Sequence, residues 1–132
     1  MILVDTSAWV EFLRDTGSQA CEAVDRLLAT GLAICDPVAM EVLAGARGEH
    51  HLAQLRGLLG RATMLPTTPA DYDAAAALYR SCRVRGETVR KLFDCLIAAV
   101  AIRAEAEVLH VDVDFDVMAR LTDLRVHPAS KQ

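Results

Sequence analysis

Three features that direct many chains to a membrane, to the cell exterior or to a zinc site are missing here. No uninterrupted apolar stretch approaches the roughly 20 residues of a membrane helix. The N-terminus lacks a basic region and reaches Asp5 after only four residues, so we expect no signal peptide and a cytoplasmic protein. The four cysteines lack the paired spacing of a zinc site, and we expect reduced thiols in the core.

An excess of basic residues is also missing. The formal net charge is −4, whereas a nucleic-acid-binding surface is usually basic. Two bound divalent cations would bring this charge to about zero, so the metal-free protein should bind nucleic acid poorly. Several basic residues, among them Arg90 and Lys91, fall within twelve positions of the chain. A solvated helix end would explain this cluster as well as a phosphate-binding surface would.

The chain of 132 residues is long enough for one core, and 53% of its residues are hydrophobic. We therefore expect a single domain over residues 1–132. Short apolar runs predict strands at 2–4, 32–35, 108–111 and 124–126, the last at a sheet edge. Helical spacing and capping residues predict helices after Thr6-Ser7, over 18–31, from an Asp36-Pro37 cap, and over 49–59, 68–86, 94–106 and 116–121. This alternation predicts an α/β fold of three layers, a central parallel sheet flanked by helices.

Acidic residues stand where apolar stretches meet polar ones. Asp5 ends the first apolar run, Asp112 closes a later one, and Asp94 precedes the apolar run 95–102. Glu41 interrupts a fourth apolar stretch. A carboxylate buried at such a place costs several kcal/mol unless a cation meets it. Asp94 could instead cap a helix and Asp112 could be a loop residue, but functional groups of open α/β sheets gather beyond the strand ends. Together the acids predict a Mg²⁺ or Mn²⁺ site.

Four segments resemble the motifs of a PIN domain of the VapC toxin type. They are residues 1–9 (MILVDTSAW), 37–45 (PVAMEVLAG), 94–99 (DCLIAA) and 110–116 (HVDVDFD). Their order and spacing fit the family, so the resemblance covers essentially the whole chain. Position 91 departs from it, because lysine stands where many members carry a small hydroxyl residue, and Phe93 immediately precedes the third acid. These departures leave every acidic position filled and bear on substrate choice.

The resemblance implies a Mg²⁺-dependent endoribonuclease in which Mn²⁺ can substitute, the toxin of a type II toxin–antitoxin pair. It implies cleavage of structured RNA such as tRNA or ribosomal RNA loops, a homodimer, and inhibition by a VapB-like antitoxin. It also implies a catalytic and metal-binding quartet with a fifth acid and a neighbouring hydroxyl: Asp5, Glu41, Asp94 and Asp112, then Asp114, and Thr6 or Ser7. The clustering of basic residues before the third acid further predicts RNA phosphate contacts by Arg90 and Lys91.

Phosphodiester hydrolysis explains why several carboxylates are needed. Two cations about 3.5–4 Å apart can hold the attacking and the departing oxygens. Water is then the nucleophile, and the products should carry 5′-phosphate and 3′-hydroxyl ends. No histidine is required. Trp9 and Phe12 are expected in the core or at a dimer contact.

Three other classes have to be weighed. A receiver domain has similar length and a Mg²⁺ pocket, but it needs adjacent acids after the first strand, where Thr6-Ser7 stand. A haloacid-dehalogenase-type phosphatase needs an Asp-x-Asp motif at that strand. A PIN-like binding module without catalysis is the third alternative, and retention of every acid counts against it.

Overall fold

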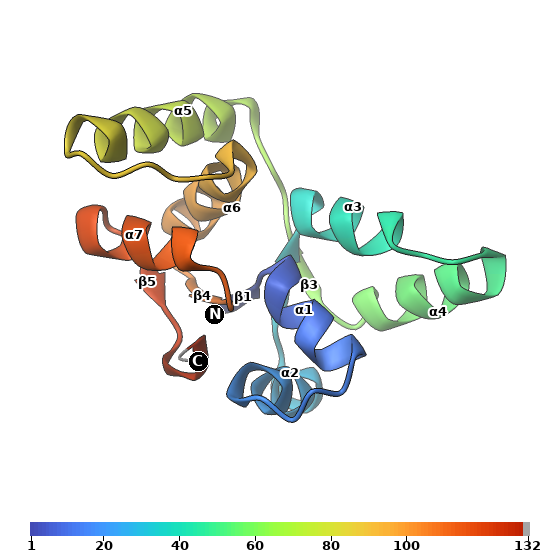
Figure 1. Cartoon of the computed structure of the whole chain (residues 1–132). Helices are drawn as coiled ribbons and strands as arrows, with labels where there is room; N and C mark the ends of the chain where they lie inside the picture. Colours follow the sequence, from blue (N-terminus) through green and yellow to red (C-terminus); the bar gives the residue numbers. More distant parts are fainter. Residues whose placement is uncertain (131–132) are drawn as a thin grey trace.

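A five-stranded parallel sheet lies at the centre of the computed structural model, which describes residues 1–130 (Figure 1). The strands are ordered β3-β2-β1-β4-β5, and each neighbouring pair is parallel. Their bounds are β1 Ile2–Val4, β2 Ala33–Cys35, β3 Thr63–Leu65, β4 Glu107–Leu109 and β5 Arg125–Val126. The predicted α/β fold with a central parallel sheet is confirmed.

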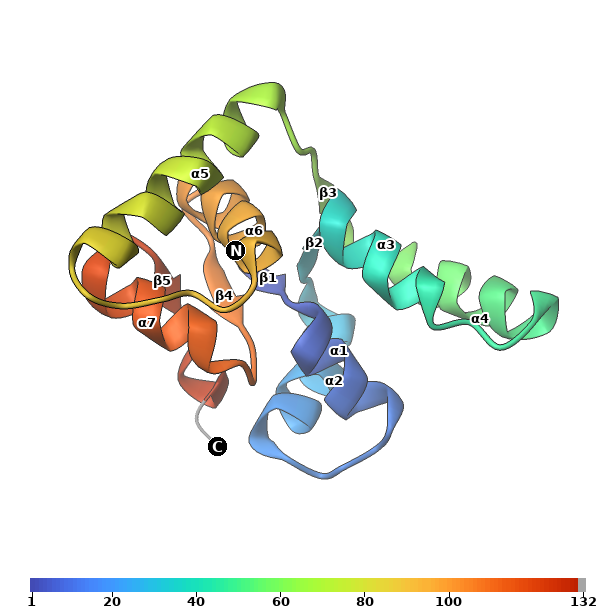
Figure 2. The same cartoon turned by 45° about the horizontal axis from the view of Figure 1, so that its top comes forward.

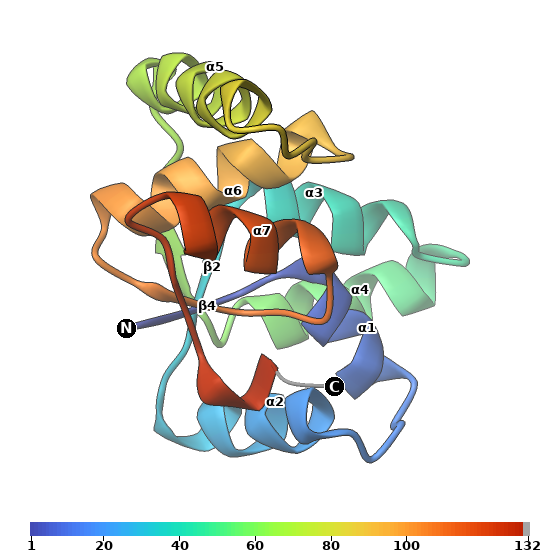
Figure 3. The same ribbon diagram turned by 60° about the vertical axis from the view of Figure 1, so that its left-hand side comes forward.

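Helices cover both faces of this sheet. Figure 3 shows α6 and α7 on one side and α1 and α2 on the other, with α5 outside α6. The pair α3 and α4 projects beyond the β2–β3 side of the sheet (Figure 2). The helices are α1 Thr6–Leu13, α2 Gln19–Thr30, α3 Asp36–Ala44, α4 Glu49–Leu59, α5 Pro69–Val84, α6 Leu92–Arg103 and α7 Val113–Leu121, followed by the 3₁₀ turn η1 Pro128–Ser130.

Two of the predicted helix starts are confirmed by their capping bonds. The Ser18 hydroxyl accepts a hydrogen bond from the Cys21 N–H at 3.1 Å, as expected for an N-cap residue. Thr68 and Asp71 form a capping box at the start of α5, with a proline in its first turn. The Asp71 carboxylate also accepts a hydrogen bond from Arg103 Nε at 2.9 Å. One aspartate therefore caps α5 and fixes it against α6.

The core lies on both sides of the sheet. Eight consecutive residues of α6, from Asp94 to Ala101, are buried, which explains why this helix is apolar nearly all round. Trp9 is completely buried and meets Phe12 edge-on, so the expected core position of Trp9 is confirmed. All four cysteines are buried free thiols. None of the helices in residues 1–130 has the length and apolarity to span a bilayer.

Two helices start earlier than the sequence predicts. The buried helix begins at Leu92 and not at Asp94, which occupies its first turn. The helix predicted from Asp116 begins at Val113, because the Asp112 side chain accepts a hydrogen bond from the Asp114 N–H and caps it. The acids at these positions thus lie within helix starts, where the free N–H groups and the helix dipole favour negative charge.

The predicted Asp36 cap was wrong, and one strand of the sheet was missed. Asp36 is the first residue of α3, and Cys35 is its N-cap. The Asp36 carboxylate instead accepts a hydrogen bond from the Thr67 N–H at 3.1 Å, across the segment that leads to α5. Strand β3 was not predicted, because its three residues form a sheet edge and two of them, Thr63 and Met64, are exposed. Such a strand has no apolar pattern to reveal it.

Candidate metal centre at the carboxyl edge of the sheet

Strand β1 lies at the point where the order of the strands reverses. The chain proceeds from β1 through β2 to β3 on one side and then returns to place β4 and β5 on the other. In open α/β sheets the crevice beyond such a point is the usual place for a functional site. The Asp5 N–H donates to the Leu109 carbonyl at 3.0 Å, which aligns the residue after β1 with the end of β4. Asp112 follows three residues later.

Asp5 is a buried carboxylate that caps α1. Its Oδ2 accepts hydrogen bonds from the Ser7 N–H at 3.0 Å and from the Ser7 hydroxyl at 2.6 Å. Its Oδ1 is buried without a hydrogen-bond partner. Burial raises the pKa of Asp5, although the bonds from Ser7 act in the opposite direction. The Ser7 oxygen also accepts from the Val111 N–H at 3.0 Å, so one hydroxyl joins the ends of both central strands.

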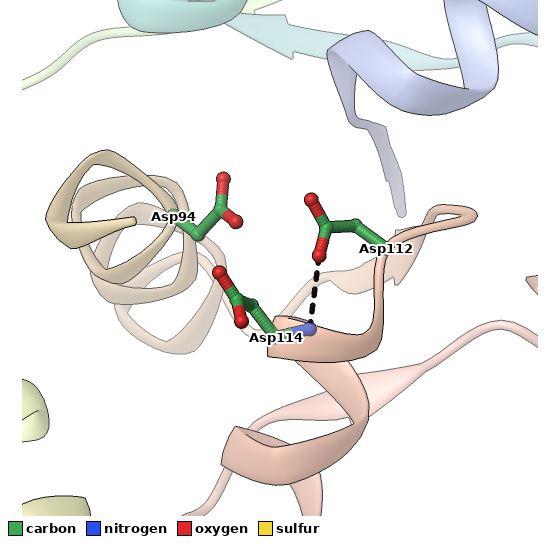
Figure 4. Close-up of side chains that lie close together, drawn as sticks. All are labelled: Asp94, Asp112 and Asp114. Carbon is green, nitrogen blue, oxygen red and sulfur yellow. Dashed lines mark hydrogen bonds between the residues drawn. The ribbon is translucent and has the colours of Figure 1, made fainter. Parts of the chain in front are cut away.

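Three aspartates meet beside this point, as Figure 4 shows. Asp94 comes from the first turn of α6, Asp112 is the N-cap of α7, and Asp114 lies in the first turn of α7. Each can offer one carboxylate oxygen such that all three atoms lie within 4.8 Å of one another. All three residues are buried, with exposed fractions of 4% for Asp94, 9% for Asp112 and 1% for Asp114. Like charges this close and this little hydrated require a compensating cation or a proton.

Asp114 holds the loop that enters α6. Its Oδ1 accepts from the Arg90 N–H at 3.1 Å, and its Oδ2 accepts from the Lys91 N–H at 3.0 Å. Both oxygens are thus used by main-chain donors just before Asp94. The sequence left open whether Asp112 and Asp114 face the same way. The helix start at residue 113 answers this, since both carboxylates turn toward the loop at 90–91.

Asp94 carries the clearest electrostatic signature of the site. Its pKa is raised from 3.8 to about 8, first by burial and then by the charges of Asp5 and Asp112 and by the hydrogen bond with Asp114. Its Oδ2 is buried without a hydrogen-bond partner. The influence of Asp5 on this pKa shows that the residue after β1 belongs to the same electrostatic cluster.

The two predicted phosphate-binding cations lie against the acids. Arg90 contacts Asp112 with Nη2 at 3.1 Å and Asp114 with Nε at 3.3 Å. Lys91 Nζ lies 2.6 Å from Asp112 Oδ2 and 3.7 Å from Asp94 Oδ2. Burial acts to raise the pKa of Asp112, but these cations and the Asp114 N–H bring it below its usual value. Both basic side chains remain more than half exposed, at 64% and 57%.

Glu41 lies at the rim. It is exposed on α3, and its Oε1 accepts a hydrogen bond from the Thr6 hydroxyl at 2.7 Å. Its charge contributes to the raised pKa of Asp5, so it faces the same edge of the sheet. The structure therefore brings Asp94, Asp112 and Asp114 into direct proximity, with Asp5 beside them and Glu41 linked through the Thr6 hydroxyl. The division of roles among the five acids stays a prediction.

His110 supports Asp112 in a way that the sequence did not reveal. The ring is fully buried, and its Nδ1 accepts a hydrogen bond from the Asp112 N–H at 3.0 Å. Burial lowers the pKa of this imidazole, although Asp116 lies 3.3 Å from its Nε2. In the sequence, His110 stands two residues before Asp112, which is a weak signal that the two interact. The turn after β4 is what brings the imidazole to the main chain of Asp112.

An apolar cleft of about 550 Å³ opens next to the acids. It lies between α3, α5 and the start of α6, and its lining includes Met40, Tyr72, Leu92 and Phe93. Three of these side chains, Met40, Tyr72 and Leu92, are more than half exposed. In the chain, Met40 directly precedes Glu41 and Phe93 directly precedes Asp94. The apolar lining of the cleft suits hydrophobic contact and not metal binding.

The residues present fit a hard divalent cation. The donors are carboxylate oxygens, which Mg²⁺ and Mn²⁺ prefer. Two buried oxygens, Asp5 Oδ1 and Asp94 Oδ2, lack hydrogen-bond partners, as expected for atoms whose partner is an ion. The trio Asp94, Asp112 and Asp114 is therefore a candidate metal centre.

Comparisons with known proteins identify the family of this chain. The family model of the PIN domain matches residues 2–121. Ribonuclease VapC11 of Mycobacterium tuberculosis is 50% identical over 129 residues, which are 95% of this chain and 96% of that protein. The structure of VapBC2 from Rickettsia felis, bound to a promoter DNA fragment, has a TM-score of 0.77 at 19% identity, covering 96% of this chain and 98% of that one. Mycobacterium tuberculosis VapC20, a sarcin–ricin loop cleaving toxin, has a TM-score of 0.66 at 19% identity, covering 95% and 99%.

The parallel sheet, the acidic edge and the family match together define a PIN domain. Within that class the chain belongs to the family of VapC ribonucleases, the toxins of toxin–antitoxin systems. The predicted family is confirmed. The receiver alternative also conflicts with the strand order, because receiver sheets are ordered β2-β1-β3-β4-β5.

Proposed function

We propose that this protein is a Mg²⁺-dependent endoribonuclease that acts as the toxin of a type II toxin–antitoxin pair and cuts structured RNA, such as a loop of tRNA or ribosomal RNA. The main support is the convergence of Asp94, Asp112 and Asp114 within 4.8 Å in a chain that is 50% identical to a VapC ribonuclease. Asp5 adds a buried oxygen without a hydrogen-bond partner next to them.

Within this proposal the acids divide the work of holding Mg²⁺. Asp94 and Asp112 would be direct ligands, with Asp5 and Glu41 completing the catalytic set and Asp114 as the fifth acid. Bound Mg²⁺ supplies positive charge for the phosphate oxygens and lowers the pKa of water to give a nucleophile. Asp114 also orders the loop at 90–91 through the two main-chain N–H groups that it accepts. Ser7 orients Asp5, and Thr6 orients Glu41.

The substrate side of the proposal rests on exposed cations beside the acids. Arg90 and Lys91 reach the acidic cluster while more than half of each side chain faces solvent. An RNA phosphate that approaches the metal would therefore meet a guanidinium and an ammonium at the entrance. Arg90 can hold a phosphate with two N–H groups, whereas Lys91 acts as a point charge.

The proposed partner is a VapB-like antitoxin whose apolar side chains occupy the cleft lined by Met40, Tyr72, Leu92 and Phe93. Solvent-exposed hydrophobic residues gathered in one cleft are typical of protein interfaces. A basic antitoxin side chain would then reach the neighbouring acids. We further propose that residues 1–132 form one domain. We also propose that the chain forms a homodimer, and light scattering on the purified toxin would test this oligomeric state.

Cleavage of total cellular RNA tests the enzymatic proposal most directly. The purified chain is incubated with RNA in Mg²⁺, in Mn²⁺ and in EDTA, and the ends of the fragments are mapped. We expect discrete cuts with 5′-phosphate and 3′-hydroxyl ends in either metal and none in EDTA. Fragments that end in a 2′,3′-cyclic phosphate, or full activity in EDTA, would contradict the hydrolytic mechanism.

The toxin role needs a separate experiment. Expression of the chain alone should arrest growth, and expression from its native locus should co-purify a small basic protein. Replacing Met40 by Glu should weaken the complex, because it places a charge in the apolar cleft. Unchanged growth together with the absence of a bound partner would contradict the toxin proposal while leaving the nuclease proposal open to the RNA assay.

A further inference from the structure

Lys91 contacts all three aspartates of the candidate metal centre. Its main-chain N–H donates to Asp114 Oδ2 at 3.0 Å. Its side chain turns back from the N-cap of α6, so that Nζ lies 2.6 Å from Asp112 Oδ2 and 3.7 Å from Asp94 Oδ2. Asp94 Oδ2 is one of the buried oxygens without a hydrogen-bond partner. The Lys91 ammonium thus makes the shorter of the two cation contacts with Asp112 and is also paired with Asp94.

We infer that the Lys91 ammonium is a built-in counter-cation that competes with the divalent ion for Asp112 and Asp94 and so sets the metal affinity of the site. This inference rests on the proposed metal centre. Lys91 holds the acids together in the metal-free protein and has to leave Asp112 when the ion binds. Lys91 is therefore a positioning residue that stabilises the metal-free site and weakens metal binding.

Electrostatics require this competition. A divalent ion bound to Asp112 and Asp94 and an ammonium paired with the same two carboxylates would be like charges only a few ångströms apart. Like charges this close repel each other strongly inside a protein, and a divalent ion doubles the repulsion that a monovalent ion would cause. Both cations cannot keep these positions. The lysine is the one that can move, because 57% of its side chain is exposed and its stem is flexible.

Arg90 is held differently and does not compete in the same manner. Its guanidinium contacts Asp112 Oδ1 and Asp114 Oδ1, and its main-chain N–H binds Asp114 as well. Among the ion pairs within residues 1–130, those that involve Asp112 Oδ2 and Asp94 Oδ2 are both made by Lys91. After it has left these oxygens, the Lys91 ammonium remains beside the site. An RNA phosphate can then replace the carboxylates as its partner. Metal binding would thus release a cation for the substrate.

Direct measurement of Mn²⁺ binding, without RNA, tests the inference. Free Mn²⁺ is followed by electron paramagnetic resonance during titration of the wild type and of Lys91→Met, which keeps the length of the stem and removes the charge. Lys91→Arg keeps a cation at the position. Arg56→Met is the matched control, since it removes one positive charge from an exposed position on α4.

Lys91→Met should bind Mn²⁺ roughly fivefold more tightly than the wild type, the factor that corresponds to breaking an exposed ion pair. Lys91→Arg, which keeps a competing cation, should bind no more tightly than the wild type, and Arg56→Met should be unchanged. Equal or weaker Mn²⁺ binding by Lys91→Met than by the wild type would overturn the inference. An equal gain in affinity in Arg56→Met would also overturn it, because net charge alone would then explain the effect. Failure of every protein to bind Mn²⁺ would instead contradict the proposed metal centre.

Thermal unfolding gives a second measurement that does not depend on activity. In EDTA, Lys91→Met should unfold at a lower temperature than the wild type, because the Asp112 carboxylate has lost the ammonium 2.6 Å away. Added Mg²⁺ should raise its Tm by more than that of the wild type, since ligand binding stabilises in proportion to affinity. An equal Mg²⁺-induced rise in both proteins would count against competition.

Discussion

Replacing Asp94 by Asn should stabilise the metal-free protein at alkaline pH and abolish RNA cleavage. The amide is nearly isosteric with the protonated carboxyl, and its NH₂ group can donate to Asp114 as the acid proton does. Burial and the neighbouring carboxylates raise the pKa of Asp94 from 3.8 to about 8. The wild-type fold therefore keeps a proton on this residue that the unfolded chain releases near pH 4.

The sign of the effect follows from proton counting. Between pH 4 and pH 8 the folded wild type binds more protons than the unfolded chain, so its free energy of unfolding falls as the pH rises. A shift of about four pH units at 1.36 kcal/mol each gives a loss of up to roughly 5 kcal/mol at pH 8. The pKa of about 8 already includes the lowering effect of the Lys91 charge, and small rearrangements of the folded protein reduce the loss further. Asp94→Asn removes the titrating group and with it this part of the pH dependence.

Urea unfolding in EDTA at several pH values between 4 and 8 measures the difference. The stability of Asp94→Asn relative to the wild type should increase by a few kcal/mol across this range, whereas Asp73→Asn, an exposed position on α5, should show no such trend. In Mg²⁺ the wild type should recover stability and the variant should not, since the amide lacks the charge that Mg²⁺ requires. Parallel pH profiles for the wild type and Asp94→Asn would refute the reasoning.

Three further predictions concern the neighbours of Asp94. Asp5→Asn should leave the protein folded but without cleavage activity; a circular dichroism spectrum and the RNA assay check this, and residual activity near that of the wild type would remove Asp5 from the catalytic set. Ser7→Ala should lower the free energy of unfolding by about 1–2 kcal/mol, because Asp5 loses its hydroxyl donor, and a change below 0.5 kcal/mol in urea unfolding would contradict that contact. Arg90→Gln should weaken RNA binding for all sequences and reduce the salt dependence of log Kd by about one, as filter binding at several salt concentrations would show.

The sequence predicts the candidate site better than it predicts the contacts within it. Each acid stands next to an apolar run, and the alternation of strands and helices brings these positions to one edge of the sheet. The start of α6 was less predictable, because its N-cap residue Lys91 makes no side-chain capping bond. The start of α7 was missed although Asp112, a typical N-cap residue, directly precedes Val113. The bond between His110 and the Asp112 N–H depends on the turn after β4, and the contact of Lys91 with Asp112 depends on how the loop at 90–91 folds around Asp114. Contacts of that kind arise from tertiary structure, which local patterns do not encode.

Net charge is a poor guide to RNA binding in this chain because the charges are unevenly placed. The value of −4 includes the aspartates that crowd the carboxyl edge of the sheet, next to the cations that would meet RNA phosphates. Without metal these cations pair with the acids, so neither charge is available to a substrate. Under the proposed function a divalent ion neutralises the acids and releases the lysine in one step. The cation paired with Asp112 then decides how the site acts on RNA. With Lys91 there the site repels RNA, and with a divalent ion there it attracts RNA.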